Sequence, residues 1–212
     1  ARIGHGGATV AFETLATRRL GALPARGGTA VRPIPSAIQR IVTYDRRILR
    51  RTSPRNRDAV RAKIVDPSTV RRMVGVGDGR ARVEVWTGLR GDGREQLFVT
   101  RGARRALLLS GGFCPLSPDT PAVMTCAVFG VAQPGGRTEE YLVIGRVSPD
   151  VAEVAISERG RRDQTVIPEN GWFVARRSTV GPIRLVARDA AQRRVGSSRP
   201  GNGGGSLILL TT

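Results

Sequence analysis

The sequence contains a single histidine, His5, a single lysine, Lys63, two cysteines and only 4% aromatic residues. One histidine is too few for the usual zinc sites, and His5 lies between glycines without a neighbouring nucleophile. The chain has no G-x-S-x-G nucleophile elbow, and a Ser-Lys pair would depend on Lys63 in an arginine-rich helical segment. With so few aromatic rings, the core must consist of valine, leucine, isoleucine and alanine.

Long apolar runs are also missing, and no stretch approaches the ~18 to 20 residues that cross a bilayer. We therefore expect no transmembrane segment. The start of the chain, Ala1–Ile3, lacks the basic and then apolar pattern of a signal peptide. If the protein is exported, its targeting segment is absent from this chain.

Paired carboxylates and phosphate loops are poorly represented. Glu139 and Glu140 are the only adjacent acidic pair. Neighbouring side chains of a strand point to opposite faces, which favours the solvated start of a strand over a glycosidase pair. The glycine-rich segment 75–79 lacks the lysine and the following helix of a phosphate loop and is typical of a turn. We expect no catalytic residue, no metal ion and no cofactor.

The charge is one-sided, because 35 basic residues face 17 acidic ones and the net charge is +18. Lys63 is the only lysine, so the other 34 basic residues are arginines. A high-GC genome explains arginine in place of lysine, but it does not explain the excess of basic over acidic residues. That excess would attract nucleic acid, anionic lipid or anionic wall polymers through nonspecific electrostatics.

The N-terminal part divides into two segments of different composition. Residues 1–35 form an extended Gly/Pro/Arg-rich arm, with one short helix expected at Thr9–Leu20. Residues 36–74 form a helical segment that packs on the main domain. Its apolar stripe consists of Ile38, Ile41, Val42, Ile48 and Leu49. Its other side carries the candidate polyanion-binding residues Arg40, Arg46, Arg47, Arg50 and Arg51.

The main helix of this segment is expected to run from Ser36, its N-cap, to about Arg51. A second helical piece is expected at Arg55–Lys63. Residues Asp66–Thr69 are then expected to cap a short turn that ends near Val74.

From residue 75 to residue 212 the apolar period changes from about 3.6 to 2, which predicts an antiparallel β-domain, sandwich or barrel-like. Asp-Gly pairs at 77–79 and 91–93 are typical of hairpin turns. The expected strands are residues 81–89, Gln96–Arg101, Arg105–Ser110, Val123–Ala132, Glu140–Val147, Ala152–Ser157, Thr165–Pro168, Trp172–Arg176, Ile183–Arg188 and Leu207–Leu210.

Cys114 and Cys126 enclose eleven residues, three of them prolines. Their positions at strand edges beside a Pro-rich connection favour a disulfide; two separate buried thiols are the other interpretation. Disulfides persist in oxidising compartments, so this pair favours an exported protein.

The chain ends in a glycine-rich linker, Ser197–Gly205, and an apolar strand, Ser206–Thr212. A strand this apolar must be buried on both faces. It either completes its own sheet or adds to the edge of a neighbouring subunit. The candidate strand-exchange residues are Leu207, Ile208, Leu209 and Leu210.

Four segments follow one another as ILRRTSPRNRD (48–58), LLLSGGFC with a later TC, YLVIGRVSPDVAEVAI, and GWFVARR. Together they resemble a group of uncharacterised exported proteins from high-GC, actinobacterial-type genomes, over about residues 48–195. At Val147–Val151 this chain has valine where the turn of that group has glycine. The resemblance implies export and a disulfide, and the group has no assigned activity.

We therefore expect a non-enzymatic exported protein of the cell envelope with a structural or binding role. As a subunit of a larger assembly it would use its arm or its C-terminal strand to bind copies of itself or other envelope proteins. The alternative is a basic protein that binds nucleic acid or another polyanion. Against sequence-specific recognition, the chain lacks helix-turn-helix punctuation, zinc fingers and strand aromatics for base stacking.

Overall fold

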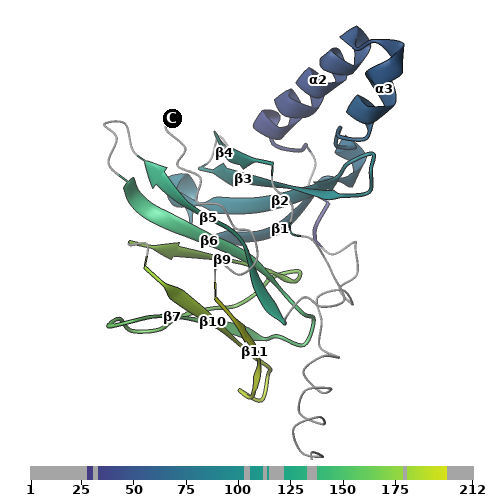
Figure 1. Ribbon diagram of the computed structural model, residues 1–212. Helices are drawn as coiled ribbons and strands as arrows, with labels where there is room; N and C mark the ends of the chain where they lie inside the picture. The colour runs from purple at the N-terminus through teal and green to yellow at the C-terminus, as the bar shows by residue number, and fades with distance from the viewer. Residues whose placement is uncertain are drawn as a thin grey trace, which may run out of the picture.

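The computed structural model describes residues 28–30, 33–102, 106–111, 114, 122–132, 138–178 and 181–199. In this part of the chain two helices precede eleven strands, and the strands form three antiparallel sheets (Figure 1). The predicted mainly β fold with a preceding helical segment is confirmed. The sheets do not close into a barrel.

The helical segment consists of α2 (Ser36–Arg51) and α3 (Pro54–Arg61). Both bounds of the predicted main helix are confirmed. Pro35, not Ser36, is its N-cap, because the extended backbone of Pro35 (φ −51°, ψ 132°) ends where helical geometry begins. The turn η2 (Pro67–Thr69) follows, and Asp66 caps it as predicted: its Oδ1 accepts a hydrogen bond from the Ser68 backbone N at 2.9 Å.

The first four strands form the helix-side sheet in chain order: β1 (Arg71–Val76), β2 (Val83–Leu89), β3 (Glu95–Arg101) and β4 (Ala106–Ser110). The turn η3 (Gly79–Ala81) lies between β1 and β2. β1 begins before the change of period expected at residue 75, because Arg71 and Arg72 already pair with Thr87 and Trp86. Positive-φ glycines lie in both of the predicted Asp-Gly turns.

The central sheet has the order β5-β6-β9, and its strands are β5 (Val123–Ala132), β6 (Thr138–Val147) and β9 (Trp172–Arg177). The distal sheet has the order β11-β10-β7-β8, with β7 (Glu153–Glu158), β8 (Gln164–Val166), β10 (Ile183–Arg188) and β11 (Arg194–Ser198). The predicted linker from Ser197 starts too early, because Ser197 and Ser198 pair with Val186 and Leu185 of β10.

The central sheet carries a hydrophobic core on each face, because its side chains alternate between two clusters. Those of the helix-side core include Phe129, Leu142, Ile144 and Val174. Those of the distal core include Val123, Val143, Phe173 and Ala175. A third core lies under α2 and contains Ile38, Val42, Val65, Val70, Trp86 and Phe98. The molecule is therefore a stack of four layers: helices, helix-side sheet, central sheet and distal sheet (Figure 1). The expectation of a core without large rings is wrong, because the largest fully buried side chains of the described residues are Trp86, Trp172, Phe98, Phe129 and Phe173.

Candidate polyanion-binding hairpin

The helical hairpin, defined as residues 36–63, is anchored to the helix-side sheet at both of its ends: through the first two turns of α2, and after α3 through the Ala62 carbonyl, which accepts a hydrogen bond from the Asp92 backbone N at 2.9 Å. Ala37, Ile38 and Val42 are its buried residues. Throughout the fully described stretch 43–64 no residue is buried, and the far ends of α2 and α3 extend away from the helix-side sheet (Figure 1). Ile48 was expected to pack on the β-domain and is instead 40% exposed. That expectation is wrong because α2 has left the sheet before this turn.

The hairpin concentrates positive charge. It contains eight arginines and Lys63 against two carboxylates, Asp45 and Asp58, for a net charge of +7. The five candidate residues, Arg40, Arg46, Arg47, Arg50 and Arg51, are all exposed. Among the described residues none of these five makes a hydrogen bond or an ion pair. A cationic surface without internal partners attracts anions at long range.

The arginines of the sheets are in a different situation. Ten arginines of the strands and their connections form ion pairs with eight carboxylates. The described residues of the hairpin form one ion pair, between Arg61 and Asp58 at 3.4 Å, and both side chains are largely exposed. Such an exposed pair contributes little. Among the described residues the β-body also has exposed arginines without an ion pair, for example Arg80, Arg159, Arg162 and Arg184, but the hairpin carries its excess of +7 on 28 residues.

Two carboxylates, one on the hairpin and one close to it, have shifted pKa values. Burial raises the pKa of Asp45, the single acidic residue of α2, above its ordinary value. Close to the hairpin, hydrogen bonds from Ser68 hold the pKa of Asp66 below its ordinary value, and the charge of Arg46 contributes to this shift. The field of the hairpin thus extends to neighbouring residues of the body.

Two large apolar side chains lie on the same surface. Tyr44 is 64% exposed and Ile48 is 40% exposed, and they lie four positions apart on α2, which places them about one helical turn apart. A shallow hollow of about 560 Å³ opens beside Tyr44, between Arg40 and Arg47. The hairpin surface therefore combines cationic and apolar contacts.

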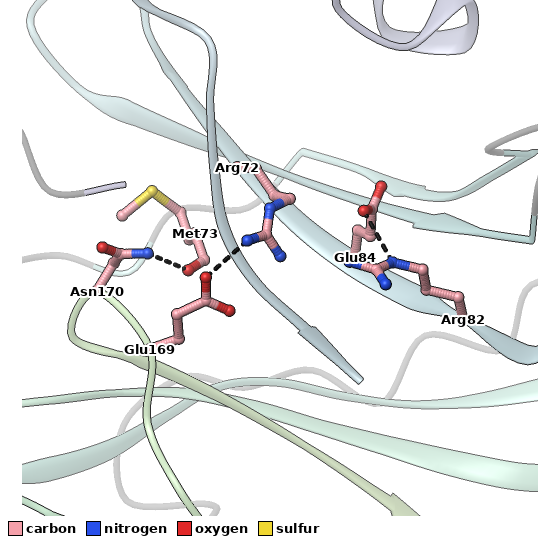
Figure 2. Close-up of polar contacts among 6 residues, drawn as sticks. All are labelled: Arg72, Met73, Arg82, Glu84, Glu169 and Asn170. Atoms are coloured by element: carbon pink, nitrogen blue, oxygen red, sulfur yellow. Dashed lines mark hydrogen bonds and ion pairs between the residues drawn. The ribbon is translucent and has the colours of Figure 1, made fainter. Parts of the chain in front are cut away.

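A second polar cluster joins the helix-side sheet to the connection before β9 (Figure 2). Arg72 Nη2 lies 2.7 Å from Glu169 Oε1, and the Asn170 side-chain amide donates to the Met73 carbonyl at 2.8 Å. Beside them Arg82 pairs with the buried Glu84 at 3.1 Å. Two arginines and two glutamates balance in charge, so this cluster holds layers together and leaves no surplus charge for an anionic ligand.

Glu140 was expected at the solvated start of a strand, and the structure corrects this. Glu140 is buried, its Oε2 accepts from Arg176 Nε at 2.6 Å, and its Oε1 lies 3.2 Å from Arg101. The arginines belong to β9 and β3, far from Glu140 in the sequence, so only the packing of two sheets reveals the cluster. It is a structural link between the helix-side and central sheets.

Arg146 forms a further link between the same sheets. Its guanidinium lies 2.7 Å from Glu95 Oε2 and 4.8 Å from the centroid of the Trp172 ring. Desolvation lowers the pKa of Arg146, and the charge of Glu95 opposes the shift. The carboxylate and the aromatic face both stabilise this buried cation, and its Nε has no hydrogen-bond partner among the described residues. This arrangement again indicates a structural role.

The predicted disulfide between Cys114 and Cys126 is present, with the two Cα atoms 5.2 Å apart. Cys114 follows β4, and Cys126 lies in β5 where the register with β6 shifts. The alternative of two separate buried thiols is wrong. The bond connects the helix-side sheet to the central sheet.

The described residues bring together no group of three His, Cys, Asp or Glu side chains that could hold a metal ion. Within the same residues no helix is long and apolar enough to cross a membrane. The expectation that the protein is not an enzyme stays a prediction.

Several expected features lie outside the described residues. They are the helix at Thr9–Leu20, His5, and the strand-exchange residues Leu207, Ile208, Leu209 and Leu210. The choice between a C-terminal strand in its own sheet and one added to a neighbour stays open.

No known protein family matches this chain. A comparison with curated proteins and one with solved structures also find no match. The resemblance to exported actinobacterial-type proteins therefore stays a prediction.

Proposed function

We propose that this protein is a non-enzymatic, exported protein of the cell envelope whose cationic hairpin binds a polyanion. The observation that carries the proposal is the contrast between ion-paired arginines in the sheets and exposed, unpaired arginines on α2. Guanidinium groups bind phosphates and carboxylates in a planar, two-pronged geometry, which suits this ligand class. The Cys114–Cys126 disulfide supports an oxidising compartment.

The sheets and the hairpin have different roles in the proposed function: the sheets provide a stable body and the hairpin provides the binding surface. Buried ion pairs and three cores hold the sheets together, whereas the hairpin contributes few buried side chains beyond its first two turns. The hairpin can therefore meet a ligand without disturbing the sheets. Binding through it would be electrostatic and sensitive to salt.

The test compares two variants with equal loss of charge. One changes Arg46, Arg47, Arg50 and Arg51 to Gln. The control changes Arg80, Arg159, Arg162 and Arg184 to Gln, four exposed arginines of the β-body. Glutamine has nearly the same helix propensity as arginine, so α2 should persist. Each variant is titrated with duplex DNA and with polyphosphate over a range of salt concentrations.

We expect the hairpin variant to lose most of its affinity for DNA and polyphosphate. On DNA, the slope of log K against log salt concentration should also become shallower by up to about four units, roughly one unit per lost phosphate contact. The control should lose less, because its arginines are divided between the helix-side turn η3 and the distal sheet and do not lie along one helix. Equal losses in the two variants would show that only the overall charge matters and would overturn the proposal. Fractionation of the producing cells tests export, and recovery of the protein in a reducing compartment would contradict that part.

A further inference from the structure

The hairpin surface has one feature that a soluble polyanion does not explain. Within the described part of the chain three large apolar side chains are exposed, namely Tyr44, Ile48 and Ile167. Ile167 lies by itself after β8, but Tyr44 and Ile48 are adjacent on the cationic helix. Single exposed apolar residues are ordinary, whereas a pair within a cationic surface indicates a partner with both anionic and apolar parts.

We propose that the hairpin docks on an anionic lipid surface, a specific form of the polyanion binding proposed above. Tyr44 and Ile48 would lie at the boundary between headgroups and acyl chains, where tyrosine is a favoured residue. Arg40, Arg47 and Arg51 lie within three to seven residues of Tyr44 along α2 and would contact headgroup phosphates. The hollow beside Tyr44 lies between two of these arginines.

The positive charge of the hairpin favours an anionic bilayer over a second copy of the chain as the partner of Tyr44 and Ile48. Two hairpins with a net charge of +7 each repel one another, so Tyr44 and Ile48 are poorly placed for self-association. An anionic bilayer attracts the same surface, and each arginine near it strengthens binding by about fivefold at moderate salt. The absence of buried residues throughout 43–64 lets the hairpin reach a flat surface ahead of the sheets.

The experiment measures co-sedimentation of the full chain with vesicles of phosphatidylcholine alone or mixed with phosphatidylglycerol. The test variant is Tyr44→Ser/Ile48→Ser. The control is Ile167→Ser, which removes an exposed isoleucine of the distal side. Melting temperatures of both variants are measured first, because changes at exposed positions should leave folding intact. Duplex DNA and polyphosphate serve as soluble anions.

The wild-type chain should bind the phosphatidylglycerol vesicles and not the neutral ones. The Tyr44→Ser/Ile48→Ser variant should bind these vesicles about ten- to a hundredfold more weakly, while its affinity for soluble anions stays unchanged. Ile167→Ser should bind like the wild type. Raised salt should abolish binding to soluble anions before it abolishes binding to vesicles, since apolar contacts are not screened.

Three results would overturn the inference. Undiminished vesicle binding by Tyr44→Ser/Ile48→Ser would show that charge alone acts. A parallel loss on DNA would indicate base stacking by Tyr44 and a nucleic-acid partner. Binding of soluble anions without any binding to vesicles would refute the lipid partner and leave the proposed polyanion binding intact. If the fourfold arginine variant equals its control on every ligand, the proposed function itself fails.

Discussion

The three isoleucines of α2 differ in burial and provide a graded test of how the hairpin is anchored. Ile38 is fully buried, Ile41 is half-buried against the same core, and Ile48 is 40% exposed. Changing each one to alanine removes the same atoms from the same helix. The cost in free energy of unfolding should therefore follow burial in the order Ile38, Ile41, Ile48.

The magnitudes follow from the surroundings of each side chain. Ile38 packs in one core with Trp86 and Phe98, whose bulky rings would close a cavity only partly, so Ile38→Ala should cost about 3 to 5 kcal/mol. Ile41→Ala should cost about half as much. Ile48→Ala should change stability by less than about 0.5 kcal/mol, because little surface is uncovered and alanine is the better helix former.

Urea denaturation followed by far-UV circular dichroism measures these differences, and thermal melting gives an independent check. For a chain of this size, Ile38→Ala should lower Tm by about 6 to 20 °C. A cost for Ile48→Ala equal to that for Ile38→Ala would refute the reasoning. It would mean that the far half of α2 is packed in solution, against the sheets or against a partner.

Three further predictions concern other parts of the molecule. Reduction should raise the intact mass by two protons, and Cys114→Ser/Cys126→Ser should lower the free energy of unfolding by about 3 kcal/mol; an unchanged mass would contradict the disulfide. Hydrogen bonds, first of all from the Arg193 side chain, lower the pKa of Asp189 in the folded protein. The ionised Asp189 therefore stabilises the fold at pH values above the unfolded pKa of about 3.9. This stabilisation is lost as the pH falls through the lower pKa of the folded state. Asp189→Asn should flatten the acid side of the stability–pH curve, and an acid limb as steep as that of the wild type would argue against this role. If the strand Ser206–Thr212 completes its own sheet, its deletion should lower the Tm of a monomer. If the strand is donated to a neighbouring subunit, the deletion should dissociate oligomers while the Tm stays constant. A truncated chain with unchanged melting and unchanged size-exclusion behaviour would show that neither holds.

The local sequence pattern predicts those helices and strands in which apolar and polar side chains alternate with a clear period. The bounds of α2, β5 and β10 agree with the sequence prediction residue for residue. β1 and β11 escape prediction, because RRMVGV and RVGSS have weak alternation and become strands by pairing with β2 and β10. These two segments are strands because of the partner strands that the folded chain places beside them, and a local sequence pattern does not contain that information.

The site divides in the same way. The exposure of the five α2 arginines follows from the helical period of their apolar neighbours. The sequence does not predict that these arginines lack ion-pair partners among the described residues, because this depends on where carboxylates from distant parts of the chain lie in the fold. Glu140 shows the converse: its adjacency to Glu139 indicated a solvated position, and arginines of two other strands made it a buried link. Similarly, the period of α2 cannot reveal that the sheet ends before Ile48.

The chain divides into two halves between β4 and β5, and each half builds its own layers of the molecule. Residues up to β4 build the helices and the helix-side sheet, and residues from β5 onward build the other two sheets. The Cys114–Cys126 bond spans this division, and the helix-side core draws on both halves. A protease that cuts between the two cysteines would leave one covalent molecule as long as the bond is oxidised. Reduction of the cut chain would leave the two fragments joined only by noncovalent contacts, namely that core and the ion pairs between the helix-side and central sheets.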